Sequence, residues 1–254
     1  MSSGSSGLGV VVVTGGSRGI GAAVARLAAA RGYAVVVNYA HDEAAARAVV
    51  AQITEAGGRA VPIRADVAHE AEVVALFVQA EAALGPLYGL VNNVGISGGF
   101  ARVAELRAET LARVLAVNVA GPFLCAREAV RRLSTAMGGR GGAIVNISSL
   151  AGRRGGAGEW VHYAASKGAI NTFTVGLATE VAGEGIRVNA VAPGLIETGF
   201  HAASGAPDRL ARMTPGIPMG RVGTPDEIAE AVLWLLSPAA SYVTGAIIDA
   251  GGGR

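Results

Sequence analysis

A tyrosine and a lysine stand four residues apart, at Tyr163 and Lys167, near the start of a long Ala-rich stretch. If that stretch is helical, residues i and i+4 lie on one face, so the ammonium sits near the phenol. A free phenol, with a pKa of about 10, is a poor acid–base catalyst at neutral pH. A cation within about 4–6 Å lowers that pKa by roughly 1–3 units. The pair therefore predicts a tyrosine that exchanges a proton with a reacting oxygen.

Lys167 is the only lysine of the chain, so 20 of the 21 basic residues are arginine. A guanidinium is a planar fork and an ammonium is a compact point charge, so the two are not interchangeable in a confined site. Chance survival of one lysine is the alternative explanation. The count favours a site that needs a compact ammonium.

Two further polar groups precede this pair in the chain. Ser148 and Ser149 follow a short β-branched run. A serine hydroxyl at the end of a strand could donate to a substrate oxygen where charge develops, and an ordinary strand-end cap is the alternative. Asn118 lies between two apolar helical segments, where its amide is either a structural group or the holder of a water molecule. Spacing alone does not decide between these roles.

A glycine-rich loop, Thr14–Gly21, comes directly after the first β-branched run and before an Ala-rich helix. Gly15, Gly19 and Gly21 permit a tight turn and close backbone approach, and the helix N-terminus offers free N–H groups to a pyrophosphate. The position at the first strand–helix turn makes a dinucleotide site the better interpretation, with a purely structural turn as the alternative.

The end of the second expected strand indicates which dinucleotide binds. An acidic residue there would bind the adenosine ribose of NAD, but the strand ends at Asn38-Tyr39 and no acid follows before Asp42. Arg18, inside the glycine loop, could meet a 2′-phosphate. The pattern favours NADP(H), with NAD(H) still possible. Asp66, after the third strand, could accept from the adenine amino group, cap the next helix, or do both.

Composition limits the other functional classes. The chain has 254 residues, 51% of them hydrophobic, so it can bury a core and disorder is not expected. Cys125 is the only cysteine, which fits a reducing compartment, and a cytoplasmic protein is expected. Basic residues are scattered at a net charge of +2, so no nucleic-acid surface is expected. No apolar run reaches the ~18–20 residues that span a bilayer, and no metal site is expected.

Short apolar runs alternate with longer amphipathic ones, which predicts right-handed βαβ units. The expected strands are Gly9–Val13, Ala34–Asn38, Ala60–Arg64, Leu87–Asn92, Ala143–Ser148, Arg187–Val191 and Ala246–Asp249. The expected helices are Ile20–Arg31, Asp42–Ala56, His69–Leu84, Ala104–Asn118, Pro122–Met137, Tyr163–Ala182 and Pro225–Leu236. The fold class is α/β, a doubly wound parallel sheet of seven strands.

No linker divides the chain, so residues 8–254 are expected to form a single Rossmann-type catalytic domain after a flexible leader or cloning remnant, 1–7. The stretch 193–224 breaks the alternation with several prolines and glycines. A connection this long in an α/β domain is usually functional, and a substrate loop is the expected role. A tolerated surface insertion is the alternative.

Taken together, these positions resemble the short-chain dehydrogenase/reductases over essentially the whole chain after residue 7. The motifs that carry the resemblance are, in order, Thr14–Gly21, Asp66, Asn92–Gly95, Asn118, Ser149, Tyr163–Lys167 and Pro193-Gly194. A Tyr-x-x-x-Lys pair alone is weak, but all of these at these spacings are specific. Within the family the sequence is most similar to the 3-oxoacyl-carrier-protein reductases and to neighbouring sugar and ketone reductases.

The resemblance implies hydride transfer between a nicotinamide, NADP(H) here, and a small carbonyl or secondary alcohol substrate. It implies a catalytic tetrad with Tyr163 as general acid/base and Ser149 polarising the carbonyl. Lys167 would lower the tyrosine pKa and hold the nicotinamide ribose, and Asn118 would hold a proton-relay water. The implied cofactor contacts are Gly15, Ser17, Arg18, Gly19, Ile20, Gly21, Asn38, Tyr39, Asp66, Val67, Asn92, Val94, Gly95, Tyr163, Lys167, Pro193, Gly194, Ile196 and Thr198.

The sequence departs from the family pattern in places. Val94 stands where alanine is usual, and Ser149 precedes Tyr163 by 14 residues instead of 13. Glu184 stands where carrier-protein reductases often have a basic residue, although Arg140 could serve, so docking of an acyl-carrier protein is not favoured. The resemblance implies a homotetramer packed through 225–252. The pocket-wall candidates are Ser97, Trp160, Val161, His162, and His201 and Met213 in the 195–220 loop.

Three other functions compete with a reductase. Gly95–Gly99 matches the G-x-S-x-G of hydrolases, but glycines and Phe100 follow where a helix should begin. A protein that senses NADP without catalysis predicts the loss of a tetrad residue, yet all four are present. An NAD-dependent sugar dehydrogenase is a less favoured variant of the main interpretation.

Overall fold

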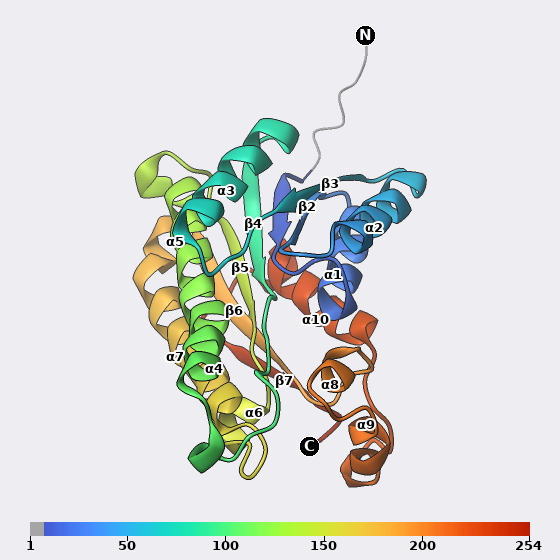
Figure 1. Cartoon of the computed structure of the whole chain (residues 1–254). Coiled ribbons are helices and arrows are strands. Elements are labelled where there is room, and N and C mark those ends of the chain that lie inside the picture. The colour runs from blue at the N-terminus through green and yellow to red at the C-terminus, as the bar shows by residue number, and fades with distance from the viewer. Residues whose placement is uncertain (1–7) are drawn as a thin grey trace.

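Seven parallel strands pair side by side in the order β3-β2-β1-β4-β5-β6-β7 (Figure 1). They are β1 (Val10–Val13), β2 (Ala34–Tyr39), β3 (Arg59–Arg64), β4 (Leu87–Asn92), β5 (Gly142–Ile147), β6 (Ile186–Pro193) and β7 (Ile247–Ala250). The computed structural model describes residues 8–254, so the leader expected at 1–7 lies outside the described residues. The doubly wound seven-stranded sheet expected from the sequence is confirmed.

Helices cover both faces of the sheet (Figure 1). One face carries α1 (Gly19–Ala30), α2 (Glu43–Glu55) and α10 (Pro225–Leu236). The other carries α3 (Glu70–Leu84), α5 (Gly121–Leu133) and α7 (Val161–Val181), with α4 (Ala108–Leu115) leading into α5. Three short helices complete the set: α6 (Ala151–Arg154), α8 (Phe200–Ala203) and α9 (Arg209–Met213).

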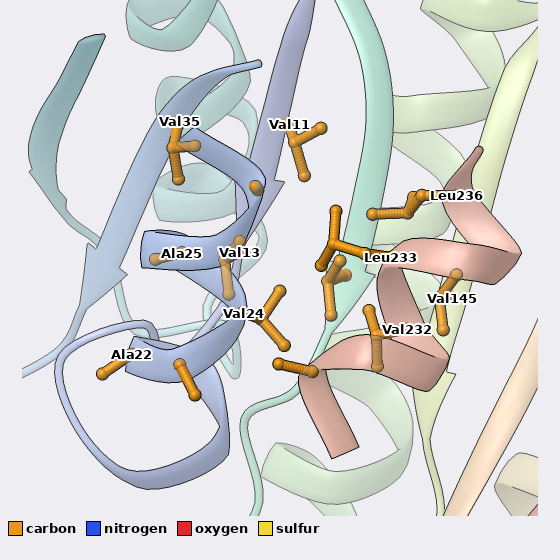
Figure 2. Packing of buried hydrophobic residues seen from close by; sticks show 14 of the residues in the cluster. Val11, Val13, Ala22, Val24, Ala25, Val35, Val145, Val232, Leu233 and Leu236 are labelled. Carbon is orange, nitrogen blue, oxygen red and sulfur yellow. The ribbon is translucent and has the colours of Figure 1, made fainter. Parts of the chain in front are cut away.

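The four valines of β1 show why this strand is central. Val11 and Val13 pack under α1 and α10 (Figure 2), and Val10 and Val12 belong to the core on the other face. Successive side chains of a strand point to opposite faces, so a strand buried on both sides needs an unbroken apolar run. All four residues are at most 1% exposed. The β-branched run therefore fixes β1 in the middle of the sheet.

The helical region around Asn118 differs from the expectation of two separate helices. The chain runs from α4 into α5 without a break, through a π-helical turn at Ala116–Ala120. Pro122 does not interrupt it. Proline has no backbone N–H to donate, and in the first turn of α5, just after the wider π turn, no helical hydrogen bond is lost for that reason. Gly121 allows the turn to approach the sheet, since a Cβ there would lie 2.6 Å from Val67 Cγ2. π turns of this kind occur often at functional sites.

The continuous helical stretch Ala108–Leu133 is, by length and composition alone, apolar enough to cross a membrane. It is not an unbroken apolar run, because Arg113, Arg127 and Glu128 interrupt it, so it does not contradict the sequence expectation. Its alanines and valines raise the mean hydropathy, and the charged residues lie toward its ends. The stretch packs against the sheet through Val117, Cys125, Ala126, Ala129 and Leu133. Near its start Arg113 forms an ion pair with Asp66, 2.8 Å apart.

The order of the strands defines where a ligand can enter. From β1 the chain first winds outward through β2 and β3, then returns to place β4 on the other side of β1. Ligands of open α/β sheets bind at such a switch point, outside the carboxyl ends of the strands. The loops after β1 and β4 both lie there. The 193–224 segment, expected to be irregular, contains α8 and α9 and follows β6 at the same edge.

Candidate active site

The glycine-rich loop after β1 requires glycine at three positions. Gly15 and Gly19 have φ values of +61° and +53°, which favour glycine. A Cβ on Gly21 would lie 2.3 Å from the Gly15 carbonyl oxygen, so only glycine fits where α1 packs against the loop. No acidic residue occupies the first turn of α1, and its free N–H groups and positive dipole end therefore suit an anion.

Asn38, expected to contact the cofactor, instead ties the glycine loop to the sheet. Its Oδ1 accepts from the Gly15 N–H at 3.3 Å. Its Nδ2 donates to the carbonyl oxygens of Ile63 at 3.2 Å and Ala65 at 3.0 Å. The side chain is only 1% exposed, and its amide is engaged in these hydrogen bonds within the protein. The side chain therefore does not face the crevice, and only the backbone of Asn38 could meet a cofactor.

Replacement of Asn38 by Ala should destabilise the fold by about 2–3 kcal/mol, because buried polar partners are left without a hydrogen bond. The free energy of unfolding from urea titration would measure the loss. Gln52→Ala, on the exposed side of α2, is the control and should change stability by less than about 0.5 kcal/mol. Equal stability of the two variants would show that the hydrogen bonds of Asn38 do not stabilise the glycine loop.

A second clasp joins the loops after β1 and β4, and sequence reasoning missed its central residue, Asn93. Asn93 Nδ2 donates to the carbonyl oxygens of Thr14 at 2.9 Å and Gly15 at 3.0 Å. The Thr14 hydroxyl accepts from the N–H groups of Asn93 and Val94. The signal was available, because polar residues directly follow both strands that flank the switch point. These bonds hold the two walls of the crevice at a fixed separation.

Arg18 lies at the outer edge of the glycine loop. Its side chain is 73% exposed, and Nη2 lies 3.3 Å from Asp42 Oδ2. Asp42 also caps α2, where its Oδ1 accepts from the Ala45 N–H at 3.0 Å. A cleft of about 490 Å³ opens here between the glycine loop, α2 and the start of the 193–224 segment, lined in part by Ser17, Arg18 and Thr198. The cleft gives a dinucleotide phosphate room beside a cation.

The side chains of several other residues expected to contact the cofactor lie in the protein interior. Asn92 is 3% exposed and donates to Asn146 Oδ1 at 3.0 Å, inside the sheet. Tyr39 and Val67 are core side chains, so only their backbone atoms can meet a ligand. Sequence reasoning treated strand-end positions alike, although neighbouring residues of a strand face opposite ways.

Asp66 holds its carboxylate in two contacts, with a side chain that is 14% exposed. Its Oδ2 pairs with Arg113, and its Oδ1 accepts from the Ala68 N–H at 3.0 Å. Burial raises the pKa of Asp66, but Arg113 and the Ala68 N–H outweigh it and lower the pKa below its ordinary value. The helix-cap role was wrong, because α3 begins at Glu70 with His69 as its cap residue.

The four tetrad candidates lie close together beneath the loop after β4. Asn118 is fully buried on the π turn, and its amide bonds both the N–H and the C=O of Ile96 at 2.8 Å. Lys167 Nζ donates to the Ile147 carbonyl oxygen at 2.7 Å. A Cβ on Gly95 would lie 3.3 Å from Lys167 Nζ and 3.6 Å from Asn118 Oδ1, so Gly95 leaves space for both groups. Lys167 Nζ lies 5.9 Å from the centre of the Tyr163 ring.

Burial controls the protonation of the pair in the protein alone. It raises the pKa of Tyr163 to about 12, although a hydrogen bond with the Ser149 side chain acts in the opposite direction. It lowers the pKa of Lys167 to about 8. The phenol is therefore protonated at neutral pH, and the ammonium remains largely charged. A phenol held protonated in a buried site can donate to an oxygen that gains negative charge.

The two serines after β5 have different surroundings. Ser148 is 2% exposed and donates to Asn171 Oδ1 at 2.6 Å and the Lys167 carbonyl oxygen at 3.2 Å, on the side of α7. Ser149 is half-buried, accepts from the Ala151 N–H at 3.1 Å and bonds with Tyr163. Of the two serines, only Ser149 forms a hydrogen bond with the phenol of Tyr163. This contact favours Ser149 as the reactive serine.

The 193–224 segment reaches both the glycine loop and Tyr163. Thr198 Cγ2 would lie 3.4 Å from a Cβ on Gly19, so the start of the segment reaches the glycine loop. Phe200 and Trp160 lie against the Tyr163 ring, with centroids 5.6 and 5.3 Å away. Among the other wall candidates, the Ser97 hydroxyl accepts from the Ser204 hydroxyl at 2.7 Å, and His162 Nε2 bonds the Ser97 carbonyl oxygen at 2.8 Å. Val161, by contrast, is 37% exposed.

The geometry around Ser97 does not fit a hydrolase. Its hydroxyl is bonded to Ser204 and to the Gly99 N–H, and the chain after it is not helical. Across residues 8–254, no group of three His, Cys, Asp or Glu residues is arranged to hold a metal ion.

Known proteins of similar sequence and structure are oxidoreductases. A family model described as enoyl-(acyl carrier protein) reductase matches residues 15–254. An uncharacterized oxidoreductase of Escherichia coli, YgfF, is 53% identical over 96% of this chain and 99% of its own. The 3-oxoacyl-[acyl-carrier-protein] reductase of Synechocystis is 40% identical over 96% of each chain. A short-chain type dehydrogenase/reductase from Mycobacterium marinum has a TM-score of 0.91 at 35% identity, over 97% of this chain and 95% of that one.

Proposed function

The chain belongs to the short-chain dehydrogenase/reductase family, and we propose that it is an NADP(H)-dependent reductase of ketones that also oxidises secondary alcohols. Members of this family are oxidoreductases that act on alcohol and carbonyl groups with a nicotinamide cofactor. The observation that carries the proposal is the group of Tyr163, Lys167 and Asn118, which are buried, and Ser149, which is half-buried.

The residues of the crevice fit a dinucleotide. The loop at Gly15, Gly19 and Gly21 leaves room for a ligand close to the backbone, because a Cβ at these positions would strain the backbone or collide with it. The loop leads into the N-terminus of α1, whose first N–H groups have no side-chain cap. Ser17, Arg18 and the α1 N–H groups would hold the phosphates, and Thr198 with the Ile196 backbone would hold the carboxamide. When bound, the nicotinamide would supply or accept a hydride at its C4 position.

The protein would contribute the proton and hold the substrate in place. In reduction, Tyr163 donates its phenolic proton to the carbonyl oxygen as negative charge develops there. Ser149 donates a hydrogen bond to the same oxygen and stabilises that charge. Lys167 places a cation near the phenol, so the phenolate that forms is favoured. Asn118 would hold a water molecule through which a new proton arrives.

Transfer of deuterium would test the reaction directly. NADPH labelled with deuterium at both C4 positions should pass one deuterium to the carbinol carbon of the alcohol product, detected by mass spectrometry. Retention of both deuterium atoms in the nicotinamide of a protein that binds NADPH would contradict the proposal and favour a cofactor sensor.

Arg18 supports the preference for NADP(H). Its exposed pair with Asp42 is weak, so a 2′-phosphate can replace the carboxylate as its partner. Asp42 is already engaged as the cap of α2, which leaves it poorly placed to take the ribose hydroxyls of NAD.

Arg18→Ala should weaken NADPH binding about tenfold, the value of a charge-assisted hydrogen bond to a phosphate, and should leave NADH binding unchanged. Fluorescence titration of both nucleotides would measure the effect. Arg47→Ala on α2, whose arginine pairs with Glu43, is the control. A loss of affinity that is equal for NADPH and NADH would remove Arg18 from recognition of the 2′-phosphate.

We further propose that the enzyme is a cytoplasmic homotetramer without an acyl-carrier partner. The exposed aromatic residues Trp234 and Tyr242, 40% and 102% exposed, support a subunit contact through the C-terminal run. The buried free thiol of Cys125 supports a reducing compartment.

A further inference from the structure

Trp160 is fixed in place immediately before the helix that carries Tyr163. It is 5% exposed, and its indole packs against the Tyr163 ring at 5.3 Å between centroids. Phe100, from the loop after β4, stacks on the indole at 4.8 Å with the planes 17° apart. Phe200 of α8 lies 6.1 Å away and also reaches Tyr163. Phe100, Trp160 and Phe200 form what we call the aromatic wall.

Arg209 of α9 packs against two rings of this wall, Trp160 and Phe100. Its guanidinium carbon lies 4.5 Å from the centre of the Trp160 ring and 5.5 Å from that of Phe100. Its Nη1 donates to the carboxylate of Glu159, the neighbour of Trp160. The Ala101 N–H donates to the Glu159 carbonyl oxygen at 2.8 Å. One arginine therefore joins three segments: the loop after β4, the residues before α7, and the 193–224 segment.

Stability alone does not account for an arginine here. Arg209 is 5% exposed, and its Nε is buried with no protein partner among the described residues. A buried donor without a partner costs free energy, and apolar side chains of similar volume often replace buried ion pairs without loss. Such costs are usually found at functional sites.

We propose that Arg209 is a positioning residue that holds the aromatic wall against Tyr163, and that the wall selects ketones and alcohols whose reacting carbon lies in or next to a ring. The inference rests on the proposed reductase function and names the substrate class of the same site.

The electrostatics of the wall favour uncharged rings. The positive charge of Arg209 is matched by Glu159, and His201, which lies 6.1 Å from Trp160, is neutral. Burial, with the nearby Arg209, lowers the pKa of His201 to about 4 despite the opposing effect of Glu159. The faces turned toward Tyr163 are therefore apolar and aromatic. Aromatic rings pack on such faces in offset or edge-on geometry, and a rigid ring of either kind, aromatic or saturated, loses less conformational entropy on binding than a flexible chain does.

Matched ketones test the proposal. Cyclohexanone and 2-hexanone have equal carbon numbers, as do acetophenone and 2-octanone, and kcat/KM with NADPH would be compared within each pair. The wild type should favour the ring ketone by about tenfold or more, within the range that an apolar pocket can discriminate. Arg209→Lys keeps the charge but loses the planar stack, and should bring the ratio close to one, mainly through KM. Arg212→Lys, exposed on the same helix, should keep it.

A second readout does not require turnover. The chain has two tryptophans, so in a Trp234→Phe background the emission reports Trp160 alone. Arg209→Lys, or Arg209→Met if the lysine variant does not fold, should shift this emission, whereas Arg212→Lys should not.

Equal kcat/KM for ring and open-chain ketones in the wild type would overturn the substrate class while leaving the reductase intact. A fall in both by the same factor in Arg209→Lys, with unchanged Trp160 emission, would overturn the positioning role. Failure of the proposed function is distinct, because the protein would then bind no NADPH or transfer no deuterium to any ketone.

Discussion

Replacement of Tyr163 by Phe should lower turnover by about 10²–10⁴-fold, the usual contribution of a general acid, and leave NADPH binding within about twofold of wild type. The substitution removes one oxygen from a side chain that is 7% exposed and packed against Trp160 and Phe200, so the ring and its neighbours keep their places. The loss therefore reports proton transfer. Steady-state reduction of a ketone and fluorescence titration with NADPH would measure the two quantities.

The high pKa of Tyr163 gives this prediction its direction. Burial keeps the phenol protonated at neutral pH, so it is ready to donate when a carbonyl is reduced. Ser148→Ala is the matched control for a lost hydroxyl, since Ser148 bonds α7 and not the phenol. Turnover in Tyr163→Phe at the wild-type rate would assign the proton to another group.

Lys167→Arg should also lower turnover strongly, by about 10²-fold or more, even though the charge is kept. Lys167 Nζ fits between the Ile147 carbonyl and Gly95, where a Cβ would lie only 3.3 Å away, so the larger guanidinium cannot take its position. A displaced charge no longer favours the phenolate of Tyr163, and the barrier rises with it. The rate of ketone reduction and the melting temperature would be measured together, so that unfolding is separated from catalysis.

The pH dependence sharpens this test. Burial lowers the pKa of Lys167 from its ordinary value to about 8, so in the protein alone the ammonium loses its charge as pH rises through that value. NADPH affinity of the wild type should accordingly fall above about pH 8. Arginine does not titrate in this range, so Lys167→Arg should show no such step. Full activity of Lys167→Arg would mean that the single lysine survives by chance.

Most of the fold could be predicted because its signals are local. The valine runs at Val10–Val13 and Val35–Val37 identify strands that are buried on both faces, and all seven expected strands are present within a few residues. The glycine loop could be predicted because each of its glycines has a backbone reason: Gly15 and Gly19 have positive φ values, and Gly21 lies too close to the Gly15 carbonyl for a Cβ. The order of strand and helix then determines the sheet through the handedness of its connections.

Side-chain direction and contacts distant in the chain could not be predicted. Asn38 faces inward to Gly15 and β3, and nothing in the sequence around it shows this. The π turn at Asn118 depends on the approach of Gly121 to Val67, more than fifty residues away in the chain. In the sequence, nothing distinguishes Arg209 from the other arginines. Its contacts with Glu159 and Trp160 form only when the 193–224 segment folds against the residues before α7.

The central claim is that the chain binds NADPH at the glycine loop and uses it. Titration of the purified protein with NADPH and, separately, with NADH, followed by nicotinamide fluorescence, tests this most directly. NADPH should bind clearly more tightly, in keeping with Arg18 and the absence of a free acid at the end of β2. Tighter binding of NADH would transfer recognition of the ribose to Asp42 and overturn the cofactor assignment. Binding of neither nucleotide would contradict the account, because the proposed reaction requires the cofactor.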